Sequence, residues 1–270
     1  MGKIISIANA KGGVGKTSVV IELAYELSEQ GFSVGVVDND PQCNSTYHLL
    51  NQYPAIGIRD AMIGNTPWGE IVLEALHPWK NCVVFPGTKA LDGIEADLNS
   101  PGAKTVFPQQ ALAKVLRKAA KTLDYILIDN PPTLGFPMVL SLTAADYYLI
   151  PTDCSEYAVE GITSMLKHIK IIREELNEKL EFLGLVVTGF QKGNSNAVKQ
   201  TIKELEGIVG ADKILGKINH TVKVVEAQRG KSAISAMFPE IASAKEYHKI
   251  SEEIARVAQC LKQPKVKKRV

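Results

Sequence analysis

Lys11-Gly12-Gly13-Val14-Gly15-Lys16-Thr17 stands between an apolar run, residues 4–7, and a stretch with helical periodicity that begins at Thr17. Three glycines within four positions let main-chain N–H groups curl around phosphate oxygens, where a Cβ atom would obstruct them. The positive end of the following helix points at the same oxygens. The segment therefore predicts a phosphate-binding P-loop directly after the first strand of an α/β fold.

The loop and the first turn of the helix supply the expected ATP-binding residues. Lys16 would bring positive charge to the β- and γ-phosphates, and the Thr17 hydroxyl would ligate Mg²⁺. Ala10 replaces the first glycine of the usual P-loop pattern, and Lys11 adds a second lysine to the loop. The full expected set is Lys11, Gly12, Gly13, Val14, Gly15, Lys16, Thr17 and Ser18.

Three aspartates follow predicted strands. Asp38 and Asp40 come after residues 33–37, and Asp129 ends the apolar run 125–128. Carboxylates at the C-terminal ends of parallel strands project into the crevice where ligands bind. Asp38 and Asp40 could serve Mg²⁺ and the attacking water separately. An apolar strand that ends in Asp beside a P-loop is the Walker B arrangement, which holds Mg²⁺ directly or through water.

Strand and helix patterns alternate along the chain, which predicts a mainly parallel sheet with helices on both faces. We expect one P-loop NTPase domain over residues 1–262 and a basic tail at 263–270. Residues 44–102 read as a looser stretch with short helical pieces. The predicted strands are 3–9, 33–37, 82–85, 125–128, 147–150, 182–188 and 214–218, and the predicted helices are 17–30, 109–122, 137–144, 156–176, 196–209 and 244–261.

Composition excludes some functions and favours others. No stretch approaches the roughly 18 consecutive apolar residues that a membrane span needs. The four cysteines have no CxxC spacing, which argues against a zinc site or a disulfide framework and favours reduced thiols. Residues 1–159 hold 11 Lys and Arg against 16 Asp and Glu, whereas residues 160–270 hold 20 against 13. This basic C-terminal half suggests an acidic partner such as nucleic acid.

Together these motifs resemble the ParA/MinD family of deviant Walker A ATPases, in particular its short, Soj-like branch. The likeness covers nearly the whole chain, most densely over the first 46 residues and thinly over 50–105. Late in the chain, residues 222–227 with Gly230 and Lys231 match a stretch that this branch carries near its C-terminus. The other matching segments are residues 11–17, 38–42, 128–132 and 157–161.

The resemblance implies a specific cycle. Mg·ATP would join two copies into a sandwich dimer in which Lys11 reaches across to the partner's phosphates. By motif position, Asp40 would orient the attacking water, while Asp38 and Asp129 would serve Mg²⁺. The dimer would bind DNA without regard to sequence, until a ParB-like or other cargo-adaptor protein stimulates a slow ATPase. Such a protein would be cytoplasmic and nucleoid-associated.

Three residues depart from the family pattern. Asn130 stands where a small residue often follows the Walker B aspartate, and Cys43 stands where glycine is frequent. His220 occupies the place of an arginine expected to contact DNA, and histidine carries less positive charge than arginine at neutral pH. Other basic residues are therefore the DNA candidates: Lys192, Lys199, Lys203, Lys223, Arg229, Lys245 and Lys249.

Other activities on the same scaffold compete with this interpretation. A MinD-like ATPase that cycles on membranes would need an amphipathic C-terminal helix. The apolar stripe of the last predicted helix is expected to dock on the core instead. Its members are Ile254, Val257, Ala258 and Leu261. An iron–sulfur reductase would need suitably placed cysteines. An amidoligase or kinase would need substrate-binding groups, and ATP turnover that rises with a metabolite and ignores DNA would favour that alternative.

Overall fold

The computed structural model describes residues 1–190 and 196–258, in which eight strands form one sheet. The strand order is β3-β4-β2-β5-β1-β6-β7-β8. β3 is antiparallel to β4, and the remaining neighbours are parallel, as the alternating sequence pattern predicts. The strands are β1 (Lys3–Ile7), β2 (Val34–Asp38), β3 (Leu73–Glu74), β4 (Cys82–Phe85), β5 (Tyr125–Asp129), β6 (Tyr147–Thr152), β7 (Glu181–Phe190) and β8 (Ile214–Asn219).

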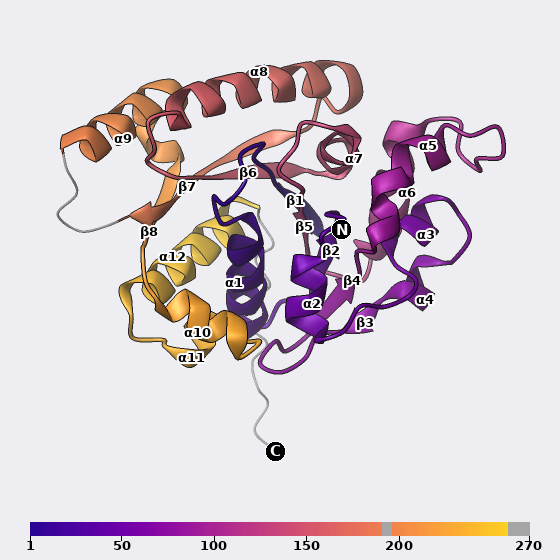
Figure 1. Ribbon diagram of the computed structural model, residues 1–270, viewed down its shortest axis with the longest axis horizontal. Helices are drawn as coiled ribbons and strands as arrows, with labels where there is room; N and C mark the ends of the chain where they lie inside the picture. Colours follow the sequence, from indigo (N-terminus) through magenta and orange to yellow (C-terminus); the bar gives the residue numbers. More distant parts are fainter. Residues whose placement is uncertain (191–195, 259–270) are drawn as a thin grey trace.

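Helices cover both faces of the sheet, so the central strands are buried on both sides (Figure 1). The side chains of β1 alternate between two cores: Ile5 and Ile7 pack toward α1, and Ile4 packs toward α6 and α7. The α-helices are α1 (Lys16–Glu29), α2 (Asn44–Leu50), α3 (Ile58–Met62), α4 (Trp68–Ile71), α5 (Ile94–Leu98), α6 (Ala111–Ala119), α7 (Phe136–Ala144), α8 (Ala158–Leu176), α9 (Asn196–Val209), α10 (Lys223–Arg229), α11 (Ile234–Met237) and α12 (Ala242–Val257).

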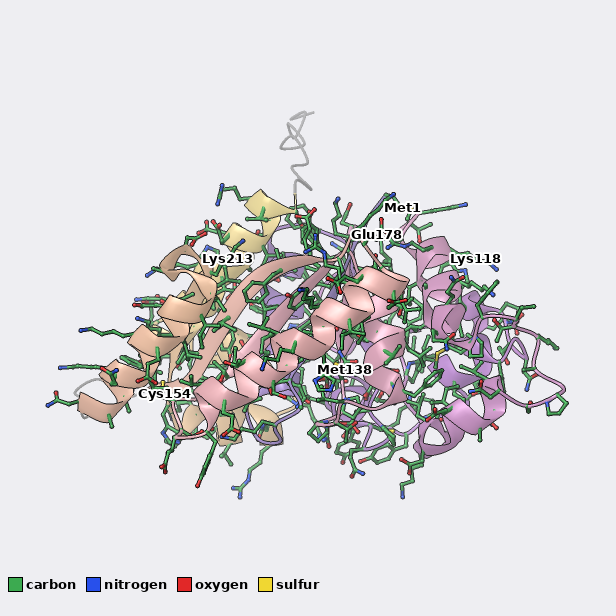
Figure 2. The ribbon with its side chains drawn as sticks, turned by 90° about the horizontal axis from the view of Figure 1, so that it is seen from above. Met1, Lys118, Met138, Cys154, Glu178 and Lys213 are labelled. Atoms are coloured by element: carbon green, nitrogen blue, oxygen red, sulfur yellow. The ribbon has the colours of Figure 1, made fainter. Side chains whose placement is uncertain are left out.

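The two helical layers have different members. α1, α2 and α12 pack on one face, and α3, α5, α6, α7 and α8 pack on the other. Viewed from above, α8 crosses the molecule between Cys154, before its start, and Glu178, after its end (Figure 2). α9 lies beside α8 at the edge of the sheet that carries β8 (Figure 1). This places the basic second half of the chain around β7 and β8.

The regular elements expected from the sequence are all present, within a few residues of their predicted bounds. Residues 44–102 hold α2 to α5 as well as β3 and β4, whereas α10 and α11 have no counterpart in the sequence prediction. Ile254 and Ala258 are buried in the core beside α1, as expected for a docked final helix. The predicted helix end at residue 261 and the tail 263–270 lie outside the described residues. Within residues 1–190 and 196–258, no helix has the length and apolar character needed to cross a membrane.

Gly184 and Gly207 give a matched pair of fold predictions. Gly184 in β7 has φ 156°, and a Cβ there would lie 2.5 Å from the main-chain oxygen of Lys213. Gly207 lies within α9, where a Cβ would meet nothing within 4 Å. Gly184→Ala should lower the free energy of unfolding by about 1–3 kcal/mol, because of this contact and the backbone strain. Gly207→Ala should raise it by roughly 0.5–1 kcal/mol, because alanine favours the helix.

Urea unfolding followed by circular dichroism measures both variants. Equal midpoints for Gly184→Ala and the wild type would contradict the close approach of β7 to the segment that leads into β8.

Candidate nucleotide site

The glycine-rich loop is held open by contacts from outside the loop. Asn9 Nδ2 donates to the main-chain oxygen of Pro151 at 2.7 Å, and Asn9 Oδ1 accepts from Lys11 N at 2.9 Å. Gly13 and Gly15 have φ of 76° and 81°, values that glycine adopts without strain. Gly15 directly precedes α1, so the curled loop delivers its free N–H groups at the N-terminus of that helix. This is the geometry predicted for a phosphate cradle.

Lys16 is nearly buried, and it lies between the loop and the carboxylates of the site. Its Nζ donates to the main-chain oxygen of Lys11 at 3.0 Å. Burial lowers the pKa of the Lys16 ammonium from its ordinary value, and the nearby carboxylates of Asp129 and Asp40 oppose this change. The ammonium group is thus placed where phosphate oxygens above the loop could replace a main-chain acceptor.

Lys11 is bonded within its own chain. Its Nζ lies 2.5 Å from Asp153 Oδ2 and 2.7 Å from Ser155 Oγ, both on the segment between β6 and α8. Partial burial raises the pKa of the Asp153 carboxyl, but hydrogen bonds from Lys11 and Ser155 outweigh burial and hold it below its ordinary value. No local sequence pattern indicates this ion pair, because the two residues are 142 positions apart.

Asp38 and Asp129 lie side by side at the ends of neighbouring strands. They are partners in the parallel register of β2 and β5, and both are almost completely buried. Asp38 accepts hydrogen bonds from Thr46 N at 2.7 Å and from Asp40 N at 3.2 Å. Burial raises the pKa of both carboxyls above the ordinary value, and the charge of Asp38 adds to the increase at Asp129. Two adjacent buried carboxylates therefore favour a bound cation or a proton.

Mg²⁺ fits this pair of carboxylates. In the part of the chain that the structure describes, neither carboxylate oxygen of Asp129 accepts a well-formed hydrogen bond. The hydroxyls of Thr17 and Ser45 nevertheless lie close enough to lower its pKa. Within residues 1–190 and 196–258, no cluster of three or more His, Cys, Asp or Glu could bind a metal on its own. Two carboxylates and a hydroxyl suit an ion that keeps water and phosphate oxygens as its other ligands.

Asp40 lies at the edge of the same site. Its Oδ1 accepts from Gln42 N at 2.9 Å, and its side chain lines a cavity of about 580 Å³. Residues 40–42, 91–95 and 131–137 supply most of the walls of this cavity. Asp40 therefore borders open space, as a residue that orients a water molecule must, and its charge acts on the Lys16 ammonium group.

Two departures from the family pattern have local explanations. Cys43, which precedes α2, has φ 55°, a left-handed conformation that favours glycine. Asn130 is buried and donates through Nδ2 to Ser6 Oγ and to the main-chain oxygen of Ile7, both at 3.0 Å. A small residue at position 130 would leave this space without a hydrogen-bond donor.

The proposed DNA contacts divide into two groups. Lys223, Lys245 and Lys249 each form an ion pair with a nearby glutamate, at 2.8, 2.9 and 3.7 Å respectively. Lys199 and Lys203 are exposed one turn apart on α9, and Arg229 is exposed on α10. None of these three has an ion-pair partner among the residues that the structure describes. Lys192 lies outside the described residues.

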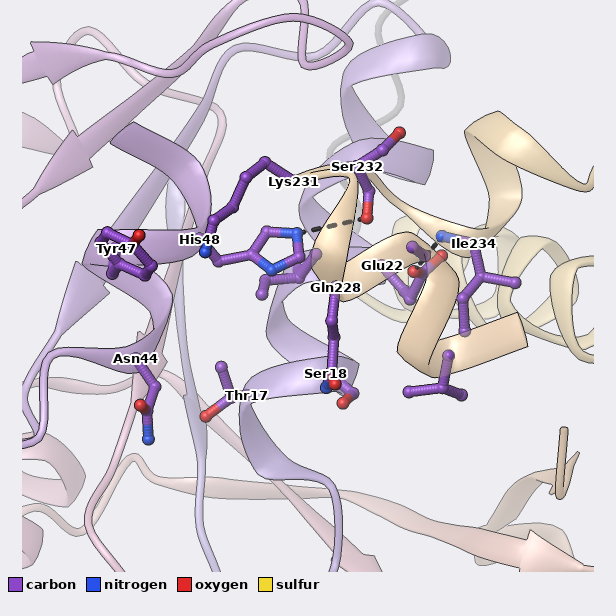
Figure 3. Close-up of a pocket in the computed structure, with 13 residues that line it drawn as sticks. Thr17, Ser18, Glu22, Asn44, Tyr47, His48, Gln228, Lys231, Ser232 and Ile234 are labelled. Carbon is purple, nitrogen blue, oxygen red and sulfur yellow. Dashed lines mark hydrogen bonds between the residues drawn. The ribbon is translucent and has the colours of Figure 1, made fainter. Parts of the chain in front are cut away.

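A pocket of about 370 Å³ adjoins the start of α1, between α2 and α10 (Figure 3). Its polar walls include residues that the sequence analysis missed. Burial lowers the pKa of His48 to about 4, and the ring Nε2 lies 3.2 Å from the main-chain oxygen of Ser232. Lys231 Nζ lies 3.5 Å from the centre of the Tyr47 ring. Glu22 on α1 accepts hydrogen bonds from Ile234 N at 2.5 Å and Ser235 N at 3.1 Å, and so ties α11 to the P-loop helix.

Comparison with known proteins agrees with this geometry. Residues 2–182 match the AAA_31 family model, described as an AAA domain. The chain is 32% identical over 265 residues to the chromosome-partitioning ATPase Soj of Thermus thermophilus, covering 94% of this chain and 96% of the relative.

Two solved structures are similar in fold. Apo McdA of Cyanthece has a TM-score of 0.83 and 22% identity, over 94% of this chain and 100% of that one. Cobyrinic acid a,c-diamide synthase of Mycobacterium smegmatis with bound ADP and magnesium has a TM-score of 0.76 and 22% identity, over 96% of both chains.

The buried carboxyl of Glu22 predicts a pH dependence of stability. Burial raises its pKa from 4.5 to about 7, so the folded protein binds a proton that the unfolded chain releases between these values. The free energy of unfolding should therefore fall as pH rises from about 4.5 to 7. In Glu22→Gln this decline should be smaller by about 1–3 kcal/mol.

Urea unfolding at pH 5 and pH 8, with EDTA present, tests this prediction. Asp212→Asn, which alters an exposed carboxylate, is the control. An unchanged decline in Glu22→Gln would show that Glu22 is not its source.

Proposed function

Because this chain belongs to the ParA/MinD family of deviant Walker A ATPases, in its Soj-like branch, we propose that it is a DNA-partitioning ATPase. It hydrolyses ATP with Mg²⁺ at the P-loop and is active as an ATP-dependent dimer. The dimer binds nucleoid DNA without sequence preference in the cytoplasm. A ParB-like or other cargo adaptor stimulates hydrolysis, and so the cycle positions a plasmid, a chromosomal locus or a protein cargo.

The convergence of Lys16, Asp38, Asp40 and Asp129 at the end of the P-loop carries the proposal. The cradle N–H groups would bind the phosphates, and Lys16 would exchange the Lys11 carbonyl for phosphate oxygens. Thr17, Asp38 and Asp129 would hold Mg²⁺, which when bound neutralises charge on the phosphates. Asp40 would orient the water for in-line attack. The diamide synthase of similar fold was solved with ADP and magnesium, which supports this assignment.

The position of Lys11 in the P-loop supports an ATP-dependent dimer, and its ion pair with Asp153 would restrain formation of that dimer. To reach a partner's phosphates, its ammonium group must leave Asp153 and Ser155. The lysine and the aspartate are 40% and 34% exposed, so the ion pair is weak enough to exchange for the stronger charge of a triphosphate. The ion pair between Lys11 and Asp153 would therefore have to break when the dimer forms, and so it would weaken ATP-dependent dimerisation.

Asp153→Asn tests this restraint. Removing an ion pair of this exposure is worth about 0.2–1 kcal/mol, and a dimer would release two such pairs, so ATP-dependent dimerisation should strengthen by up to about 30-fold. Sedimentation equilibrium with ATP, in an Asp40→Ala background that blocks hydrolysis, measures the dimer constant. Asp212→Asn is the charge-matched control. A weaker dimer in Asp153→Asn would show instead that Asp153 helps Lys11 to act.

The exposed lysines of α9 predict the DNA surface. ATP-bound protein should bind a non-specific duplex in a salt-sensitive manner, and Lys11→Ala and Lys16→Ala should not bind. In Lys199→Ala/Lys203→Ala the slope of log K against log salt concentration should become shallower by about 2 for each subunit of the dimer that contacts the duplex, because each lysine would neutralise one phosphate. Lys245→Ala/Lys249→Ala removes the same charge from ion-paired lysines and should change the slope less.

Fluorescence anisotropy of a labelled duplex across salt concentrations, in the Asp40→Ala background, makes this measurement. If the Asp40→Ala protein dimerises with ATP but does not bind DNA, the DNA part of the proposal is wrong. Turnover that then rises with a metabolite would favour an amidoligase or kinase, and binding to anionic liposomes would favour a membrane-cycling ATPase.

A further inference from the structure

Two buried asparagines join the loops that carry the acidic residues of the site. Asn39, between Asp38 and Asp40, is 0% exposed, and Asn130, directly after Asp129, is 1% exposed. Asn39 Nδ2 donates to Asn130 Oδ1 at 3.1 Å and to the main-chain oxygen of Pro137 at 2.8 Å. The main chain adds a further bond, from Asn39 N to Asp129 O at 2.9 Å.

The direction of these hydrogen bonds is fixed from both ends. A main-chain oxygen can only accept, so the Pro137 oxygen requires the NH₂ group of Asn39 to face it. The Ile7 oxygen likewise requires the NH₂ group of Asn130 to face β1. Asn130 is then left with its oxygen toward Asn39. Each amide thus has one orientation, and the pair forms a chain of bonds from α7 through both loops to β1.

The pair is not arranged for stability alone. Asn39 Oδ1 is buried and has no hydrogen-bond partner among the residues that the structure describes. A buried acceptor without a partner carries a desolvation cost that an apolar side chain would avoid. The bond between the two loops is kept in spite of that cost.

We propose that Asn39 and Asn130 are a positioning pair for the ATPase reaction, and that they make Asp40 move together with the strand end that carries Asp129. The inference rests on the hydrolysis proposed above. Asp129 lies where Mg²⁺ would bind, whereas Asp40 lies on a separate loop at the edge of a cavity. The hydrogen bond between the asparagines holds the loop of Asp40 at a fixed place relative to Asp129, so that the group that would orient the water is positioned against the group that would hold Mg²⁺.

The same network contains a control that lies away from the loops. Ser6 Oγ accepts from Asn130 and lies 2.7 Å from Ser141 Oγ on α7, and both serines are 0% exposed. Ser141→Ala removes a buried hydrogen bond of this network but leaves the bond from Asn39 to Asn130 intact. It should therefore lower the melting temperature with little effect on the rate of hydrolysis.

The experiment compares wild type, Asn39→Ala, Asn130→Ala, the double variant and Ser141→Ala. Each is measured for kcat of ATP hydrolysis, Kd for a fluorescent ADP analogue and melting temperature. Each asparagine variant should lose about 10-fold or more in kcat, because misplaced reacting groups are costly. Its Kd for the ADP analogue should change less than about twofold, since the P-loop is unaltered. The double variant should lose about as much as either single one, because both break the same link.

Hydrogen exchange of main-chain amides measures how firmly the loop that carries Asp40 is held. Peptides that cover residues 39–46 should exchange faster in Asn130→Ala than in wild type, and should be unchanged in Ser141→Ala. If all the variants have a lower melting temperature but the wild-type kcat, the two asparagines have only a structural role and the inference is wrong. If the fold losses in kcat of the two single asparagine variants multiply in the double variant, the inference is also wrong. A wild-type protein that binds ADP but never hydrolyses ATP would refute the proposed function instead.

Discussion

The parallel alignment of β1, β2 and β5 is the constraint on which the rest of the site depends. Asp129 at the end of β5 is in register with Ile7 at the end of β1 and with Asp38 at the end of β2. Three loops consequently leave the sheet at one level, and these are the P-loop and the two loops that carry acidic residues. Because the strands are buried on both faces, a shift of register would displace a whole row of core side chains.

This dependence explains how much of the protein could be predicted from its sequence. The P-loop, the three aspartates and the alternation of strands and helices are local patterns, and they identify the fold and the centre of the site. Cys43 shows that even a departure can be local, since its left-handed backbone marks a position where glycine is common. The final helix could be placed on the core because Ile254 and Ala258 repeat at helical spacing.

Interactions between distant segments could not be predicted in this way. Lys11 pairs with Asp153, Asn39 with Asn130, and Glu22 with the start of α11, across 142, 91 and 212 positions. Nothing in the local pattern marks Asp153 as a partner for a lysine, or Asn130 as more than a substitute for a small residue. The short helices α10 and α11 were missed for a related reason. They contain 7 and 4 residues, too few to show a helical period, and tertiary contacts define them.

The P-loop has hydrogen-bond partners within its own chain. The main-chain oxygen of Lys11 accepts a hydrogen bond from Lys16 Nζ, and Asp153 accepts one from Lys11 Nζ. Asn9 Oδ1 accepts a hydrogen bond from Lys11 N and so fixes the main chain of the loop. Binding of a triphosphate would therefore exchange existing bonds for new ones and need not fold the loop. Little conformational entropy remains to be lost at that step, which favours rapid loading of nucleotide. Selection between ATP and ADP would then depend on the energy of the exchanged bonds rather than on the ordering of a flexible segment.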